Sequence, residues 1–204
     1  MNWLGNELAT IGVAAQCGVR DWAGIWGDPP LIAGPLMAGY GLLGWGLVRV
    51  ARHCTTGRER QLILLCAALV FAQLVNTPLD LHAFVWTFGR CLSHAQGWYE
   101  ARRAVQMGAL MFTVVFFALL LSGLLIHFRR HLISHLLIVA GVALSIGCAL
   151  VVAISLHSLR GLMSGTWGPF RTDDLIEAGG IALAGLGVLL RLWTVRRAAV
   201  PNRL

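Results

Sequence analysis

Long apolar runs separated by short polar segments make up most of the chain after about residue 30. Five such runs cover residues 31–50, 61–77, 104–127, 135–157 and 175–195. Each approaches or exceeds the roughly 20 residues that a helix needs to cross a bilayer. The pattern therefore predicts an all-α integral membrane protein, with a bundle of about five transmembrane helices in a single membrane domain over residues 1–204.

The first 28 residues have a different pattern. Their large apolar side chains recur every three or four positions, which is typical of one stripe on a helix. The stripe consists of Leu4, Leu8, Ile11, Ala15, Val19, Trp22 and Trp26. We expect residues 1–28 to form an amphipathic helix that lies in the membrane interface. A helix packed against the outer surface of the bundle fits the pattern equally well.

Composition supports a membrane location. Hydrophobic residues make up 57% of the chain and charged residues 12%, about half of the charged fraction that is usual in soluble domains. All 16 basic residues are arginines, and they lie mostly in or beside the short segments that separate the apolar runs. That placement is typical of membrane topology and excludes a nucleic-acid partner. The absence of lysine excludes a P-loop.

Charge also predicts the orientation. With five spans, one side of the membrane carries ten arginines and the single acid Glu59, whereas the other side carries six arginines and eight acids. Short cytoplasmic segments of membrane proteins are rich in Arg and Lys. We therefore expect a bacterial inner-membrane protein with its N-terminus outside and its C-terminus in the cytoplasm.

Polar residues gather at the end of the bundle that is predicted to be extracytoplasmic. Ionisable groups near the hydrocarbon boundary are costly unless they are paired or hydrated, so they are candidates for function. Within this cluster, arginine side chains could bind a phosphate or carboxylate. The candidate ligand-binding residues are Tyr99, Glu100, Arg102, Arg103, Gln106 and Arg160.

Three residues of the same cluster could transfer protons: His157, Glu177 and Asp80. The acids also have a structural interpretation, because Asp174 and Glu177 stand in capping-box spacing at the start of a helix.

The sequence predicts no metal site and identifies no cofactor. His127, His131 and His135 are spaced by four residues and would share a face of one continuous helix. The chain must reverse direction there, so we expect these imidazoles to meet solvent and lipid head groups. Haem would require two axial histidines that face each other from different spans, which loop histidines could supply only by folding inward.

Cysteine positions predict one disulfide. Cys17 and Cys91 both fall on the outer side, where an oxidising compartment permits the bond. Cys54 falls on the cytoplasmic side, and Cys66 and Cys148 lie within spans as packing residues.

Small residues four apart predict close contact between helices. The pairs are Gly34 with Ala38, Gly141 with Ser145, and Gly180 with Ala184.

Two functions of different class fit these observations. In the first, the outer polar cluster binds an amphiphile, such as a lipid head group or a quinone, with or without acid/base chemistry. In the second, the chain is an accessory subunit that packs against partner subunits or further copies of itself. A transporter is less favoured, because the middle of each run lacks ionisable residues. The sequence does not decide whether the protein is an enzyme.

Overall fold

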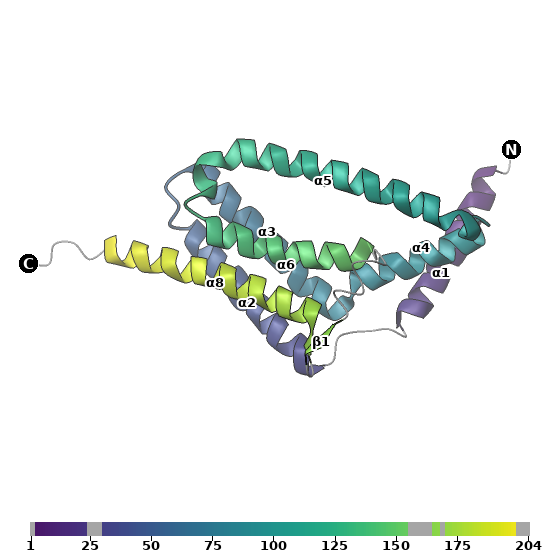
Figure 1. The fold of residues 1–204 in the computed structure, drawn as a ribbon, viewed down its shortest axis with the longest axis horizontal. Coiled ribbons are helices and arrows are strands. Elements are labelled where there is room, and N and C mark those ends of the chain that lie inside the picture. Colours follow the sequence, from purple (N-terminus) through teal and green to yellow (C-terminus); the bar gives the residue numbers. More distant parts are fainter. Residues whose placement is uncertain (1–2, 24–29, 155–164, 168–169, 199–204) are drawn as a thin grey trace, which may run out of the picture.

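The computed structural model describes residues 3–23, 30–154, 165–167 and 170–198. It is helical apart from one pair of two-residue antiparallel strands (Figure 1). The elements in chain order are α1 (Trp3–Ala23), α2 (Pro30–Ala51), α3 (Gly57–Leu79), α4 (Leu81–Ala95), the 3₁₀ turn η1 (Tyr99–Ala101), α5 (Arg102–Leu132), α6 (Leu136–Ile154), β1 (Thr166–Trp167), β2 (Phe170–Arg171) and α8 (Thr172–Ala198).

A helix occupies each of the five predicted apolar runs, namely α2, α3, α5, α6 and α8. Two segments in the described part of the chain are long and apolar enough to cross a membrane: Gly57–Leu79 and Thr172–Arg197. A shorter apolar helical segment covers Leu136–Cys148. The helical fold class and a membrane association are therefore supported, whereas the count of five spans stays a prediction.

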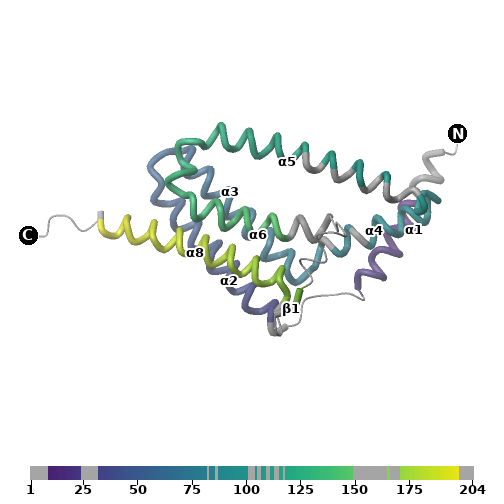
Figure 2. The backbone as a smooth tube through the Cα atoms, viewed as in Figure 1, coloured from purple at the N-terminus to yellow at the C-terminus, as the bar shows by residue number. Residues whose placement is uncertain are grey.

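The hydrophobic core lies among α2, α3, α6 and α8, which pack side by side (Figure 2). Side chains at its centre, such as Leu47, Ile63 and Ile138, are almost completely buried. The long helix α5 contributes to this core near its C-terminal end, through Leu124, Phe128 and Leu132. Over most of its length α5 exposes large apolar residues.

Glycines set the close approach of α6 and α8. A Cβ atom at Gly141 would lie 2.4 Å from the backbone N of Ala184 and 2.5 Å from the carbonyl O of Gly180, so only glycine fits. This confirms two of the three predicted small-residue contacts. The third is wrong, because Gly34 and Ala38 on α2 are exposed and nothing lies within 4 Å of a Cβ built at Gly34.

Helix α1 packs against α4 to one side of this core (Figure 1). The Trp22 indole N–H donates to the carbonyl O of Leu79 at 2.9 Å, and the Thr87 hydroxyl donates to the carbonyl O of Gly18 at 3.3 Å. The predicted N-terminal helix is therefore present, and one of its faces packs against α4. Val13 and Val19 of α1 are exposed.

Helix α3 and helix α4 are separated by a sharp turn shortly after Pro78. Helix α3 runs through Pro78 to Leu79, and Asp80 then adopts a left-handed conformation with φ of 48°. The next helix starts at once, so the apolar segment 83–88 forms part of the regular helix α4.

Candidate functional site

Glu177, a predicted acid/base residue, takes part in a polar network between three helices. The Tyr40 hydroxyl on α2 donates to Oε1 of Glu177 at 2.5 Å and lies 2.5 Å from the Ser145 hydroxyl on α6. Tyr40 is buried, and burial of its hydroxyl is tolerated because both partners form hydrogen bonds with it. Glu177 thus joins α8 to α2.

The capping interpretation of Glu177 is wrong in its register. At the start of α8, Asp174 reaches back and accepts the backbone N–H of Arg171 at 2.9 Å. The Arg171 guanidinium forms an ion pair with Asp173 at 2.6 Å. The first turn of α8 is therefore capped by Asp174, three residues before Glu177, and negative charge there suits the helix dipole.

Asp80, the second predicted acid/base residue, lies at the junction of α3 and α4. Its backbone N–H donates to the carbonyl O of Asn76 at 2.7 Å, which closes the end of α3. Its own carbonyl O accepts the Trp22 indole N–H at 3.2 Å. The backbone of Asp80 therefore shapes the turn that places α4 beside α1.

A groove lies between α1 and α4, and Tyr99 of η1 completes it. The groove has a volume of about 570 Å³. The Tyr99 ring stacks on His94, with centroids 3.7 Å apart, and the Arg90 guanidinium pairs with Asp21 at 2.6 Å. The lining residues are Val13, Ala14, Cys17, Asp21, Arg90, Cys91, His94, Ala95 and Tyr99.

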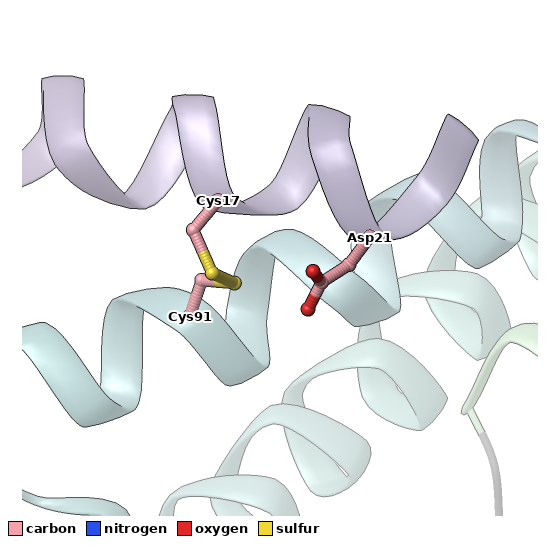
Figure 3. A group of neighbouring side chains, drawn as sticks. All are labelled: Cys17, Asp21 and Cys91. Carbon is pink, nitrogen blue, oxygen red and sulfur yellow. A yellow bond between two sulfur atoms is a disulfide. The ribbon is translucent and has the colours of Figure 1, made fainter. Parts of the chain in front are cut away.

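The predicted disulfide is confirmed and lies in this groove (Figure 3). Cys17 of α1 is bonded to Cys91 of α4 across 74 residues. A carboxylate O of Asp21 lies within 4.8 Å of both sulfur atoms. Because the sulfur atoms are bonded to each other, they are not thiolate ligands for a metal in this structure.

The remaining predicted residues lie around the start of α5 or outside the described residues. Glu100 is exposed on η1. The backbones of Arg102, Arg103 and Gln106 form the first turns of α5, immediately after Tyr99. His157 and Arg160 lie outside the described residues. Of the predicted residues, the structure places Tyr99 in the groove. Glu177 lies between α8 and α2, and Asp80 lies at the junction of α3 and α4.

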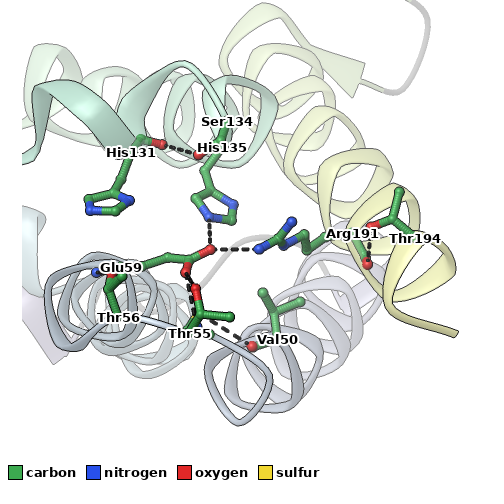
Figure 4. A network of polar contacts seen from close by, with 10 residues as sticks. Val50, Thr55, Thr56, Glu59, His131, Ser134, His135, Arg191 and Thr194 are labelled. Carbon is green, nitrogen blue, oxygen red and sulfur yellow. Dashed lines mark hydrogen bonds and ion pairs between the residues drawn. The ribbon is translucent and has the colours of Figure 1, made fainter. Parts of the chain in front are cut away.

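A second polar cluster, which sequence reasoning missed, surrounds Glu59 at the start of α3 (Figure 4). One carboxylate oxygen of Glu59, Oε1, is 2.9 Å from Nε2 of His135 and 2.7 Å from Nη2 of Arg191. The other oxygen, Oε2, accepts the backbone N–H of Thr55 at 3.1 Å. Glu59 and His135 are buried, so the expected exposure of His135 to solvent is wrong.

One sequence signal could have led to this cluster. Thr56 and Glu59 stand in capping-box spacing, and the Thr56 hydroxyl accepts the N–H of Glu59 at 3.2 Å as the N-cap of α3. The cap fixes the Glu59 backbone at the entrance of α3. The partners of the Glu59 carboxylate, His135 just before α6 and Arg191 on α8, could not be identified from spacing.

Comparisons of the chain with protein-family models, with curated proteins and with solved structures found no match. Function is therefore argued from the geometry of the sites alone.

Proposed function

We propose that this protein is a five-span inner-membrane protein that binds an amphiphile, either a lipid head group or a quinone, in the groove between α1 and α4. In this proposal the groove lies at the outer membrane surface and the C-terminus lies in the cytoplasm. The observation that carries the proposal is the make-up of the groove. It combines apolar walls, a stacked pair of rings and a cation in one concave site, which is the usual make-up of small-molecule sites.

Each part of the groove suits one part of an amphiphile. Val13 and Ala14 give apolar surface on α1, which suits an acyl or isoprenoid chain. Arg90 is partly exposed and pairs with Asp21, so its positive charge lies at the groove, where it suits a phosphate or a carbonyl oxygen. The ring pair of His94 and Tyr99 offers a flat surface for a head group or a quinone ring.

The start of α5 supplies the other residues that the sequence predicts for ligand binding. Arg102 and Arg103 directly follow η1, which carries the groove residue Tyr99, and Gln106 comes one turn later. Arginines in this segment would favour an anionic head group over a zwitterionic one.

The proposal is restricted to binding. Glu177 hydrogen-bonds to Tyr40 between helices, and neither Glu177 nor Asp80 lines the groove. Acid/base chemistry by Glu177 and Asp80 therefore lacks support from the geometry of the groove, and His157 lies outside the described residues.

Native mass spectrometry of protein extracted in mild detergent tests the proposal. We expect a bound lipid or quinone of defined mass on the unmodified protein and loss of most of it in Arg90→Gln and Tyr99→Ala. Arg171→Gln is the matched control, because Arg171 also pairs with an acid but does not line the groove. A protein without bound ligand, or equal loss in Arg171→Gln, would contradict the proposal.

One observation favours the second function, an accessory subunit. Along α5, Phe112, Leu119 and Ile126 recur every seven residues and are 72%, 69% and 74% exposed. A surface of this kind contacts either lipid chains or another transmembrane helix. A stoichiometric second polypeptide in the same mass spectrum, released by Leu119→Arg, would favour the subunit.

A further inference from the structure

The 52–56 loop, the 133–135 turn and the later part of α8 lie at one end of the bundle, which we name the basic end (Figure 1). A second groove lies at this end. It separates the start of α6 from α8 and has a volume of about 390 Å³. Its apolar walls include Ile133, Leu136 and Leu190, which are all exposed. Leu190 also lines an adjoining hollow of about 450 Å³, together with Trp193 and Arg196. The two hollows share Leu190, and we name their apolar lining along α8 the apolar track.

Positive charge borders this track. Arg191 lines the first groove and is partly exposed, and Arg196 lines the adjoining hollow. The Arg191 guanidinium uses Nη2 to contact Glu59, which leaves further N–H groups of its fork for an anion. Glu59 itself is buried and accepts from Thr55 and His135, so its carboxylate faces the protein interior.

A buried atom of the groove lining lacks a partner. His135 lines the groove, and its Nδ1 is enclosed without a hydrogen-bond partner in the part of the chain that the structure describes. Nε2 of the same ring already contacts the Glu59 carboxylate, so Nδ1 needs a partner of its own. A polar group of a bound phospholipid, either its phosphate or a glycerol hydroxyl, would supply that partner.

Two aromatic–cation pairs place the basic end at the level of lipid head groups. On α2, the Arg49 guanidinium lies 4.5 Å from the ring centroid of Trp45, and on α8 the Arg197 guanidinium lies 3.6 Å from that of Trp193. Both indoles are about half exposed. Exposed tryptophans and arginines together are typical of the interface between hydrocarbon and water.

From these observations we infer that the α6–α8 groove binds an anionic phospholipid. Its phosphodiester contacts Arg191 and Arg196, and one acyl chain lies along Leu190 and Leu136. This site is independent of the α1–α4 groove, because it lies on other helices and shares no lining residue with it.

Titration of delipidated protein with phospholipid, followed by native mass spectrometry, tests the inference. We expect phosphatidylglycerol to bind well above phosphatidylcholine with the same acyl chains. Arg196→Gln should weaken phosphatidylglycerol binding about fivefold, since one arginine near anionic lipid contributes about 1 kcal/mol. Leu190→Trp should weaken it further by filling the groove. Both positions are exposed, so these variants keep the core intact.

Arg49→Gln is the matched control. It removes the same charge at the same end of the bundle but at a residue outside both hollows. An equal effect of Arg49→Gln and Arg196→Gln would overturn the inference, because non-specific attraction between the arginines and the anionic lipid would then explain the binding. Equal binding of the two lipids, displacement by inorganic phosphate, or a polypeptide that co-purifies in place of lipid would also overturn it.

Discussion

Nε2 of His135 lies 2.9 Å from Oε1 of Glu59, although 76 residues separate them in the chain. The same oxygen accepts from Arg191 on α8, so one carboxylate holds the starts of α3 and α6 and the later part of α8 together. Both members of the His135–Glu59 pair are buried, so removal of either one would leave the other buried without its partner.

Replacement of Glu59 should therefore lower the stability of the protein. We expect Glu59→Ala to reduce the free energy of unfolding by about 3 kcal/mol, since removal of one partner leaves a buried polar group and a cation without their acceptor. Glu59→Gln should cost less, because the amide oxygen still accepts a hydrogen bond. Thermal unfolding followed by tryptophan fluorescence measures both. His127→Ala at an exposed position serves as the control, and an equal shift there would refute the special role of Glu59.

The elements of this fold could be predicted because each depends on a local pattern. The length of five apolar runs indicated α2, α3, α5, α6 and α8, and a spacing of three and four indicated α1. The disulfide followed from the side of the membrane on which Cys17 and Cys91 were expected. None of these predictions depends on which helices are neighbours in the bundle.

The sites could be predicted only in part, because they depend on the order of helices around the bundle. Tyr40 and Glu177 are 137 residues apart, and nothing in their spacing shows that α2 and α8 are neighbours. For the same reason, the sequence did not indicate that His135 and Arg191 are the partners of Glu59. Tyr99 was predicted to bind ligand, but its neighbours in the groove, on α1 and α4, were not predicted.

The glycine contact between α6 and α8 predicts a sharp difference between two substitutions. Gly141→Leu should destabilise the protein by about 1–3 kcal/mol or more, because the new side chain would overlap the backbone of α8. Gly34→Leu adds the same group at an open, exposed position of α2 and should leave the melting temperature nearly unchanged. Similar melting temperatures for the two variants would mean that α6 and α8 do not approach as described.

The Cys17–Cys91 bond should contribute measurably to stability. It closes a long loop between α1 and α4, and bonds of this kind typically contribute about 2–4 kcal/mol. Cys17→Ser should therefore lower the melting temperature under non-reducing conditions, whereas Cys54→Ser, at a free cysteine, should lower it less. Mass analysis of non-reduced digests gives the direct check. Free thiols at both positions would exclude the bond.

The proposed topology predicts opposite labelling of two exposed positions in intact cells. A membrane-impermeant maleimide should react with Gln96→Cys, between α4 and η1, and should not react with Arg52→Cys, between α2 and α3. The physical reason is the excess of arginine around residue 52, which favours the cytoplasmic side. The background carries Cys54→Ser so that the neighbouring thiol does not react. Labelling at residue 52 but not at residue 96 would reverse the orientation.

Cys54 should react slowly with alkylating reagents at neutral pH. Burial and, to a smaller extent, the nearby Glu59 carboxylate raise the pKa of the Cys54 thiol to about 11, although Arg191 opposes the rise. Because the thiolate is the reactive form, the alkylation rate should increase about tenfold for each pH unit from pH 7 to 10. At neutral pH it should be about 100-fold below that of the same thiol in denatured protein, whose pKa is about two units lower.

The effect of Glu59 on Cys54 can be separated from that of burial. In a background in which Cys66 and Cys148 are replaced by serine, Cys54 is the remaining free cysteine. Glu59→Gln removes the negative charge, so it should lower the pKa of Cys54 and speed alkylation at pH 8, whereas Arg191→Gln should slow it. Mass spectrometry of iodoacetamide-treated protein over time measures the rates. A rate that does not change with pH, or the same change for both variants, would show that the charge pair of Glu59 and Arg191 does not act on this thiol.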